Sequence, residues 1–352
     1  MPSTFTALLI RQYKMNRRNY LQALSAMFAV SAFGSCAPND KQKDTTGQKA
    51  GAGLSTPEGV AFDIPQLSDK SKNFYLVSDL GRNGYYEQKP IAELMGLLAE
   101  KIDIEFVAAA GDTHHFEGVA SVDDPLWMTN YEWIYSHPEL MLDWFAVNGN
   151  HEYRGNTQAV LDYSKVSRRW IAPSRYYSKV VKAGKKEKAL LLFIDTPPLI
   201  DKYREDAEDY PDAGKQDMEA QLGWIEKTLA ASTEKWKIVI GHHPVYAETP
   251  KDESERTDMR KRLEPLLDKY GVDMYFCGHI HNFQHIQPAG SKVDYLVNTS
   301  GSLSRKVKAI EGTKFCNPEA GFTIVSMEDE KLSFFLMNGK GKILYEYGRA
   351  KM

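Results

Sequence analysis

The sequence predicts an α/β protein in which a buried sheet is covered by helices. Apolar runs that end in a polar residue recur along the chain, first at residues 74–79 and again at residues 105–112. Segments with helical spacing follow such runs, at residues 91–102, 218–231 and 259–270. Continuous apolar runs are typical of parallel strands, which helices cover on both faces. The apolar content of 42% suffices for a large core of this kind.

Further strands are predicted where short apolar stretches end at a polar residue or a glycine. They lie at residues 144–151, 190–195, 237–240 and 274–279. The last part of the chain contains strand-like stretches that follow one another without helices between them. Strands in direct succession favour antiparallel pairing. We therefore expect a second, more antiparallel sheet packed against the first. Its strands would be residues 295–298, 322–327, 332–337 and 343–347.

Residues 1–36 have the pattern of an export signal. Arg17 and Arg18 precede an apolar run over residues 21–33, which small residues and Cys36 follow. A charged start, a short apolar middle and a small-residue exit characterise a signal peptide, and the run is too short to span a bilayer. The paired arginines resemble a twin-arginine signal, and residues 33–36 resemble a bacterial lipobox. The protein would then be periplasmic or anchored to the outer membrane by a lipid on Cys36, with an ordinary cleaved signal as the alternative.

The rest of the chain divides into a polar segment and one domain. Residues 37–72 are expected to be a flexible tether and lead-in, and residues 73–352 to be the folded domain. The net charge of -3, without a basic block beyond the N-terminus, argues against nucleic acid as a partner. Cys277 and Cys316 leave a bridge between them open but make a poor disulfide framework. The oligomeric state cannot be read from the sequence.

Polar residues suited to metal binding follow five of the predicted strands. Ligands bind beyond the carboxyl ends of strands in open α/β sheets, and a preceding glycine lets the backbone approach closely. Carboxylate, amide and imidazole groups together suit divalent transition metals. Each residue alone would be an ordinary turn residue, but the whole set in matching positions predicts a site. The candidates are Asp79, Asp112, Asn150, His151, His242, His279 and His281.

These motifs together resemble the calcineurin-like metallophosphoesterases. Within that superfamily the chain is most similar to the small purple acid phosphatases of the tartrate-resistant type, over residues 73–303. Residues 162–174 and 263–272 are also similar to stretches of that family. The resemblance implies a four-layer α/β/β/α sandwich of two mixed sheets flanked by helices. It also implies a dinuclear metal site at the carboxyl ends of the strands.

The resemblance implies a role for each candidate. Asp112 would bridge two metal ions, because its carboxylate can offer one oxygen to each. His151 would face the substrate, stabilise the developing charge and protonate the leaving alkoxide. Two ions about 3.5–4 Å apart would clamp the phosphoryl group, with a hydroxide held between them as the nucleophile. The other ligands would be Asp79 and His281 for the first metal, and Asn150, His242 and His279 for the second.

One position departs from the family's ligand pattern. Purple acid phosphatases carry a tyrosine three residues after the bridging aspartate, and His115 stands there in this sequence. Tyrosinate is an anion that holds iron in the ferric state and gives the purple colour, whereas imidazole is neutral. We therefore expect His115 to bind one of two divalent ions of iron, manganese or zinc in a colourless protein. The alternatives are that His114 is the ligand, or that neither histidine binds metal and water fills the position.

Two further departures concern Glu152 and the loop after Pro244. Glu152 stands where the family has aspartate, and we expect it to contact the metal ligands without binding an ion itself. The family's loop carries another histidine that assists acid catalysis, which this loop lacks, so Tyr246 or Glu248 is the candidate to replace it. His243 either lines the pocket or has a structural role.

The leading hypothesis is therefore the hydrolysis of small-molecule phosphate monoesters. A phosphodiesterase on the same scaffold would share the site's chemistry, so that the shape of the pocket decides between them. A surface lipoprotein that binds a ligand at a vestigial site is a third hypothesis. The complete set of ligands argues against it, because a decayed site would have lost one or more of them.

Overall fold

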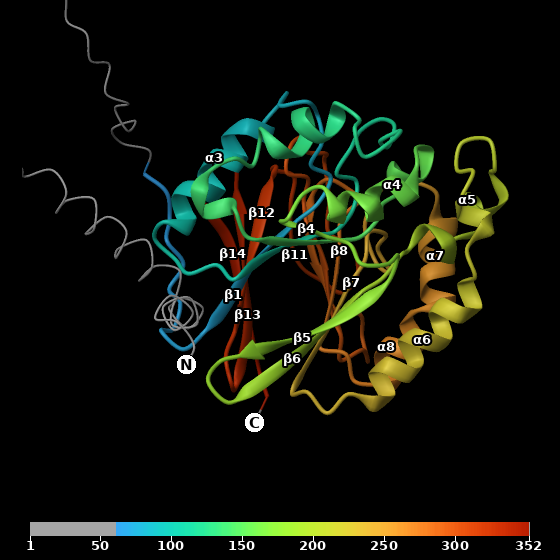
Figure 1. Cartoon of the computed structure of the whole chain (residues 1–352). Helices are drawn as coiled ribbons and strands as arrows, with labels where there is room; N and C mark the ends of the chain where they lie inside the picture. Colours follow the sequence, from blue (N-terminus) through green and yellow to red (C-terminus); the bar gives the residue numbers. More distant parts are fainter. Residues whose placement is uncertain (1–60, 352) are drawn as a thin grey trace, which may run out of the picture. The chain divides into compact units, whose positions relative to one another are not determined.

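Two sheets form the centre of the computed structural model, which describes residues 61–351 (Figure 1). The predictions for residues 1–36 and for the tether up to residue 60 lie outside the described residues. The first seven-stranded sheet has the order β14-β13-β12-β1-β2-β3-β4. Its strands are β1 (Lys72–Val77), β2 (Phe106–Ala109), β3 (Asp143–Ala146), β4 (Trp170–Ile171), β12 (Gly321–Met327), β13 (Lys331–Asn338) and β14 (Ile343–Ala350).

The second seven-stranded sheet has the order β11-β9-β10-β8-β7-β6-β5. Both sheets are mixed, because β1 to β4 run parallel beside an antiparallel group, and β6, β7, β8 and β10 run parallel between antiparallel edges. The strands of the second sheet are β5 (Tyr177–Ala183), β6 (Glu187–Phe193), β7 (Trp236–Ile240), β8 (Met274–Cys277), β9 (Phe283–Ile286), β10 (Asp294–Val297) and β11 (Thr313–Asn317).

Helices cover the outer faces of the two sheets (Figure 1). Within residues 61–351, none of them has the length and apolar composition that crossing a bilayer requires. Short 3-10 turns and one π turn complete the connections. The α-helices are α3 (Gln88–Ala99), α4 (Thr157–Asp162), α5 (Asp201–Glu205), α6 (Met218–Ala231), α7 (Glu253–Arg262) and α8 (Glu264–Lys269).

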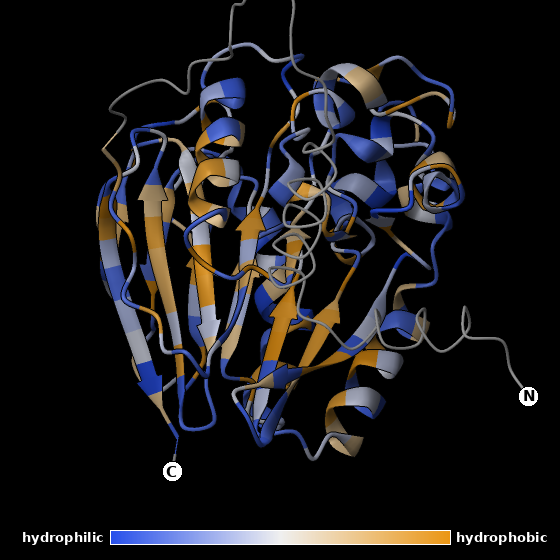
Figure 2. Ribbon diagram, turned by 60° about the vertical axis from the view of Figure 1, so that its left-hand side comes forward, coloured by the Kyte–Doolittle hydropathy of each residue, from blue (hydrophilic) through white to orange (hydrophobic). Residues whose placement is uncertain are grey.

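Side chains that alternate between the two faces of each sheet produce a structure of four layers. On β1, Tyr75 and Val77 pack in one core with α3, whereas Phe74 and Leu76 pack in a second core between the sheets. A third core joins the outer face of the second sheet to α6, α7 and α8. Successive side chains of a strand point to opposite faces, so a sheet buried on both sides needs apolar residues at every position. Figure 2 shows this as hydrophobic colouring along the central strands. The expected α/β/β/α sandwich is confirmed.

The expectation for the strand-only tail is wrong in its pairing. β12, β13 and β14 do not form a separate sheet but extend the first one, because β12 pairs antiparallel with β1. β10 instead pairs parallel with β8 in the second sheet. The free edge of β1 accepts the tail, and covering such an edge removes unpaired backbone groups. The first sheet thereby combines early and late parts of the chain, whereas the second is built from consecutive strands within residues 177–317.

A second difference concerns the helix expected over residues 259–270. The chain forms two helices there, because Leu263 ends α7 and begins α8, and Pro265 lies in the first turn of α8. Proline has no N–H to donate and its ring clashes with the preceding turn, but it is tolerated at a helix start. Asp217, by contrast, caps α6 by accepting the N–H of Ala220 at 2.9 Å, and this helix has the expected bounds. Cys277 and Cys316 are both free thiols.

A buried carboxylate joins the two sheets far along the chain. Asp294 on β10 is 1% exposed. Its oxygens accept hydrogen bonds from His285 of β9 at 3.0 Å, and from Tyr347 and Arg349 of β14 at 3.0 Å each. Burial opposes ionisation, but the partners, led by His285, outweigh it and hold the pKa of Asp294 below its usual value. The ionised carboxylate therefore stabilises the contact between the sheets.

Replacing Asp294 with asparagine is expected to lower the free energy of unfolding by about 2 kcal/mol at pH 7, because Tyr347 and Arg349 lose the charged acceptor of their hydrogen bonds. The pKa of Asp294 is lower in the folded than in the unfolded state. Its contribution is therefore present above the unfolded pKa of about 4 and is lost as the pH falls through the folded value. Urea denaturation of both proteins should show a difference that narrows below about pH 4. Glu330→Gln, which removes a 65% exposed carboxylate from its ion pair with Lys235, should change the stability little. An equal loss in both variants would contradict the prediction.

Candidate metal centre

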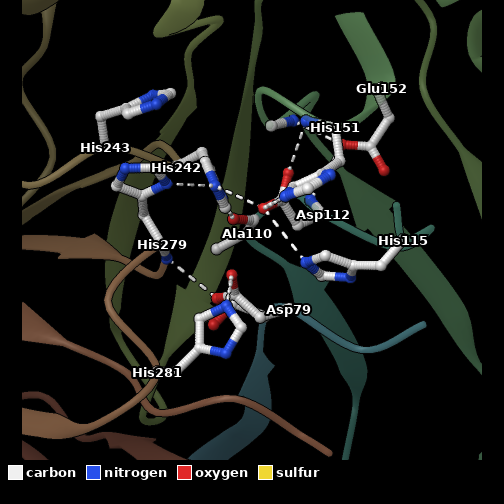
Figure 3. Close-up of polar contacts among 12 residues, drawn as sticks. Asp79, Ala110, Asp112, His115, His151, Glu152, His242, His243, His279 and His281 are labelled. Atoms are coloured by element: carbon white, nitrogen blue, oxygen red, sulfur yellow. Dashed lines mark hydrogen bonds and ion pairs between the residues drawn. The ribbon is translucent and has the colours of Figure 1, made fainter. Parts of the chain in front are cut away.

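The predicted ligands meet where parallel strands of both sheets end (Figure 3). In the first sheet β1, β2 and β3 are parallel neighbours, and in the second β7 and β8 are. Their carboxyl ends therefore share one edge of each sheet. The candidate ligands that follow these strands are at most 6% exposed, apart from His151, which is partly exposed. The residues that follow these strands are Asp79, Asp112 with His115, Asn150 with His151, His242, and His279 with His281.

Asp112 lies at the centre of the cluster. Its Oδ2 atom is 3.1 Å from Nε2 of His242, 3.4 Å from Nε2 of His115 and 3.8 Å from Nε2 of His151. Its other oxygen accepts the backbone N–H of His151 at 3.0 Å. One carboxylate thus faces imidazoles from three segments of the chain, including the second sheet. This is the position that a bridging ligand requires.

Asp79 forms the second focus of the cluster. Its Oδ1 atom is 3.1 Å from Nε2 of His281, and its Oδ2 atom accepts the backbone N–H of His279 at 2.9 Å. The Nδ1 atom of His279 in turn lies 3.2 Å from Nε2 of His242. His115 and His281 can share one ion with Asp79, since their ligand atoms all lie within 4.8 Å of one another. The geometry therefore offers two adjacent positions for a cation.

Backbone carbonyls set the tautomers of three imidazoles. Nδ1 of His115 lies 3.1 Å from the carbonyl oxygen of Gly81, and Nδ1 of His281 lies 2.8 Å from that of Leu303. Nδ1 of His242 makes the same contact with Ala110 at 2.8 Å. A carbonyl oxygen only accepts, so Nδ1 carries the hydrogen and the Nε2 lone pair points at a carboxylate. In a metal site, imidazole lone pairs and carboxylate oxygens face each other in this way because both point at the ion between them.

Buried polar atoms without partners test whether a cation fits. Oδ1 of Asp79, Oδ1 of Asn150 and Nε2 of His115 are buried and have no hydrogen-bond partner among the described residues. An unsatisfied buried oxygen or nitrogen costs about 1–3 kcal/mol, and a bound cation would satisfy all three. These atoms are also hard oxygens and imidazole nitrogens, which iron, manganese and zinc accept. The residues present therefore fit a pair of divalent ions.

The backbone is strained where it presents the ligands. Asp79, Asp112, His279 and His281 all have positive φ, between 52° and 70°. Such conformations cost non-glycine residues about 1–3 kcal/mol each and cluster at functional sites. At Gly149 a Cβ atom would lie 2.1 Å from Oδ1 of Asp112, so only glycine allows this approach. The predicted role of glycines before the ligands holds at this position.

Glu152 fixes the loop that carries Asp112. Its buried carboxylate accepts the backbone N–H groups of Asp112 at 2.9 Å, Thr113 at 2.7 Å, His114 at 3.2 Å and Gly149 at 2.6 Å. Oε1 accepts the N–H groups of Thr113 and His114, both in the loop after β2. Oε2 accepts that of Asp112 from the same loop and that of Gly149 from the loop after β3. Burial, followed by the charge of Asp112, raises the pKa of Glu152 to about 7. Glu152 thus holds two strand ends together behind the ligands, as the sequence led us to expect.

The electrostatics of the cluster follow from burial and from the two carboxylates. Burial lowers the pKa of His115 to about 4 despite the neighbouring Asp112. At His242 burial acts in the same direction, but the charges of Asp112 and Asp79 outweigh it and raise the pKa to about 9. His242 therefore lies in a negative potential set up by these two carboxylates. That potential would attract a cation equally well.

The structure also brings in Lys251, which the sequence did not indicate. Its Nζ atom lies 2.9 Å and 3.2 Å from the two ring nitrogens of His279, and it donates to the carbonyl oxygen of His279 at 3.0 Å. Burial lowers the pKa of Lys251 to about 8. The proposed substitutes Tyr246 and Glu248 are engaged elsewhere, because Tyr246 donates to Glu264 and Glu248 accepts the N–H of Lys308. Lys251 is the charged residue of this loop that reaches the centre.

Several neighbours orient the ligands without facing the cations. Glu255 of α7, also missed from the sequence, lies 2.9 Å from Nε2 of His279. This contact places the hydrogen of His279 on Nε2, so that Nδ1, which also lies 3.2 Å from Nζ of Lys251, keeps its lone pair. Both ring nitrogens of His243 have partners, Thr196 at 2.8 Å and Tyr203 at 3.0 Å, which favours its structural role. Its ligand atoms nevertheless lie within 4.8 Å of those of His242 and His279, so His243 also adjoins the cluster. His114 packs its ring against Trp127 with centroids 4.7 Å apart. It is absent from the possible ligand groups found among the described residues.

Comparison with known proteins agrees with this geometry. Residues 72–283 match the family model described as calcineurin-like phosphoesterase. The chain belongs to this family. It is 32% identical to purple acid phosphatase 4 of Arabidopsis thaliana over 296 residues, which cover 81% of this chain and 85% of the relative. It is 30% identical to the human tartrate-resistant acid phosphatase type 5 over 258 residues, which cover 69% of this chain and 78% of the relative.

Solved structures share the fold of this phosphoesterase. The chain is similar to GAP50, the anchor in the inner membrane complex of Plasmodium, with a TM-score of 0.70 and 21% identity, over 81% of this chain and 90% of that one. It is also similar to the purple acid phosphatase PPD1 of yellow lupin, Lupinus luteus, with a TM-score of 0.57 and 16% identity, over 81% and 54% of the chains. The protein is a phosphoric ester hydrolase, and its family implies a centre of two metals.

Proposed function

We propose that this hydrolase cleaves phosphate monoesters at a centre of two divalent cations. The observation that carries the proposal is the pair of buried carboxylates, Asp79 and Asp112, each faced by imidazole nitrogens whose other ring nitrogen is tied to the backbone. One cation would be held by Asp79, His115 and His281, and the other by Asn150, His242 and His279, with Asp112 between them. When bound, such a pair supplies Lewis-acid activation of water and of the phosphoryl oxygens.

The protein's own side chains would position the substrate around this pair. His151 is the ligand-cluster imidazole with the most exposed side chain, and its Nδ1 donates to the carbonyl oxygen of Phe116. Its Nε2 edge therefore faces the space in front of Asp112. From there it can hold a phosphoryl oxygen and return a proton to the leaving oxygen. Asp112→Asn is the primary test of the enzyme proposal, and full activity in that variant would overturn it.

Positive charge around the centre favours a monoester over a diester. Lys251 lies against His279, and the buried guanidinium of Arg82 interacts electrostatically with the carboxylates of Asp79 and Asp112. A monoester dianion gains more from such cations than a diester monoanion does. We expect kcat/KM for 4-nitrophenyl phosphate to exceed that for its bis-ester by at least about tenfold, and Lys251→Met to reduce this ratio. A faster bis-ester reaction would favour the phosphodiesterase alternative.

His115 should determine the metal. The cluster holds two carboxylates and no phenolate, so its fixed anionic charge matches two divalent ions better than a ferric ion. We predict that the purified protein contains two equivalents of iron(II), manganese or zinc and lacks a strong visible absorption band. His115→Tyr, loaded with iron in air, should gain a ferric phenolate band, whereas His114→Tyr should not. Metal analysis with a visible spectrum checks this, and a strong band in the unmodified protein would contradict it.

We also propose that the chain is exported and carries a lipid on Cys36. The support is the order of paired arginines, apolar run and small residues before Cys36. Labelled palmitate should be incorporated by the full chain expressed in a bacterium, and the protein should fractionate with membranes. Cys36→Ser should remain unlabelled and leave the membrane fraction, with Cys316→Ser as the matched control. Absence of label in the unmodified chain would overturn lipidation.

A further inference from the structure

A hollow at the surface adjoins the metal centre, and His115 is one of the residues that line it. The hollow has a volume of about 410 Å³ and lies between the loop after β1 and the loop after β2. The Nε2 atom of His115 is also 3.4 Å from Asp112, so the hollow and the centre share a wall. We call it the aromatic pocket. It is lined by Arg82, Asn83, Tyr85, Tyr86, His115 and Phe116.

Three aromatic rings of this pocket are largely open to solvent. Tyr85 is 72% exposed, Tyr86 63% and Phe116 67%. Single exposed apolar residues are ordinary on protein surfaces, but several gathered around one hollow indicate a binding site. Flat aromatic faces bind other flat aromatic groups by stacking, with little preference among the nucleic-acid bases. The pocket therefore suits a planar ring.

Buried side-chain amides hold the loop that carries the two tyrosines in place. The side-chain oxygen of Gln88 accepts the backbone N–H of Arg82 at 3.1 Å and of Gly84 at 2.8 Å. Asn130 accepts the N–H of Asn83 at 2.6 Å, and both Gln88 and Asn130 are fully buried. Asn83 and Tyr86 have positive φ, 53° and 55°. A loop held by buried amides in a strained form is preorganised, which reduces the entropy cost of binding.

Arg82 connects the aromatic pocket with the phosphate position. Its guanidinium carbon lies 4.9 Å from the centroid of the Phe116 ring. Its Nε atom is buried and has no hydrogen-bond partner within the described part of the chain. The planar, always charged guanidinium suits both a phosphate oxygen and an aromatic face. The carbonyl oxygen of Phe116 also accepts from His151, so the ring is joined to the residue that would face the phosphoryl group.

We propose that the aromatic pocket binds a planar ring carried by the alcohol part of the substrate, so that the protein prefers phosphate monoesters that carry such a ring, nucleoside 5′-monophosphates among them, to esters of small aliphatic alcohols. This proposal rests on the proposed monoesterase function. The phosphate would lie at the metal centre with Arg82 beside it, and the base would stack on Tyr85 or Phe116. The polar groups of Asn83 would lie at the rim of the base.

Adenosine 5′-monophosphate and ribose 5-phosphate test the proposal, because they share the ester and the sugar and differ only in the base. For the full metal-loaded enzyme we expect kcat/KM for the nucleotide to be higher by about tenfold, as one stacking contact provides. Tyr85→Ala and Phe116→Ala should each reduce this ratio severalfold. Trp133→Ala removes an aromatic ring that is 68% exposed outside the pocket, and it should leave the ratio and the rates unchanged. Equal kcat/KM values for the two esters would overturn the proposal.

Inhibition by adenosine provides a readout that does not depend on nucleotide turnover. Adenosine should inhibit competitively, with an inhibition constant that rises in Tyr85→Ala and Phe116→Ala, whereas ribose should inhibit weakly in every variant. If the enzyme cleaves only diesters, the monoesterase proposal fails, but adenosine inhibition of the diester reaction still tests the pocket. Equal inhibition by adenosine and ribose would overturn it. Melting temperatures near that of the unmodified protein would show that the variants fold.

Discussion

Replacing Asp112 with asparagine is expected to lower kcat/KM for a phosphate monoester by about 10³–10⁴-fold. The carboxylate faces His242 at 3.1 Å and His115 at 3.4 Å, between the two proposed cation positions. Asparagine keeps the shape but removes the charge, and its amide hydrogens can bond the imidazole lone pairs that a cation would occupy. Metal content per chain should therefore fall together with the activity.

Thermal stability separates the loss of metal from the loss of fold. A bound cation stabilises the folded state in proportion to the logarithm of its concentration over its dissociation constant. A chelator should therefore lower the melting temperature of the unmodified protein but not that of Asp112→Asn. Asp143→Asn is the matched control, because Asp143 is exposed at the opposite end of β3 from the site. Normal metal content and activity in Asp112→Asn would contradict the assignment of the bridging ligand.

The meeting of these residues could be predicted because parallel strands place their carboxyl ends together. A polar residue directly after an apolar run, as at Asp79 and Asp112, is a local signal that needs no knowledge of distant contacts. The bounds of α6 follow in the same way from its cap at Asp217. The clustering of the candidates is therefore a consequence of the sequence pattern, whereas their binding of metal stays a prediction.

Features that depend on long-range packing could not be predicted. Nothing local in β12 tells whether it pairs with β1 or starts a sheet of its own, because either arrangement buries the same side chains. Lys251 reaches His279 only because the loop after β7 folds back toward the centre before α7. Glu255 was missed for a similar reason, since its charged side chain on a polar helix resembles any exposed residue. Its burial at 1% exposure becomes evident only when α7 packs beside the site.

Glu152→Gln is expected to have the second largest effect, although Glu152 faces no cation. Its carboxylate accepts four backbone N–H groups, two on each oxygen. A glutamine amide would turn an NH₂ group toward two of those donors, which leaves them buried without an acceptor. A buried donor left without an acceptor costs about 1–3 kcal/mol, so we expect the two unsatisfied N–H groups to lower the stability by about 3 kcal/mol. The loop that carries Asp112 and His114 would also shift.

Activity should reveal this shift as weaker metal binding. Replacing a residue that supports metal ligands without binding the ion typically lowers metal affinity or activity by about 10–100-fold. Glu152→Gln should therefore need a correspondingly higher metal concentration for half-maximal rate. At saturating metal kcat should recover in part while KM stays near its original value, which a direct ligand such as Asp112 would not allow. Glu117→Gln, at an exposed position of the same loop region, should behave as the unmodified protein. Unchanged metal dependence in Glu152→Gln would show that Asp112 is held in place without this carboxylate.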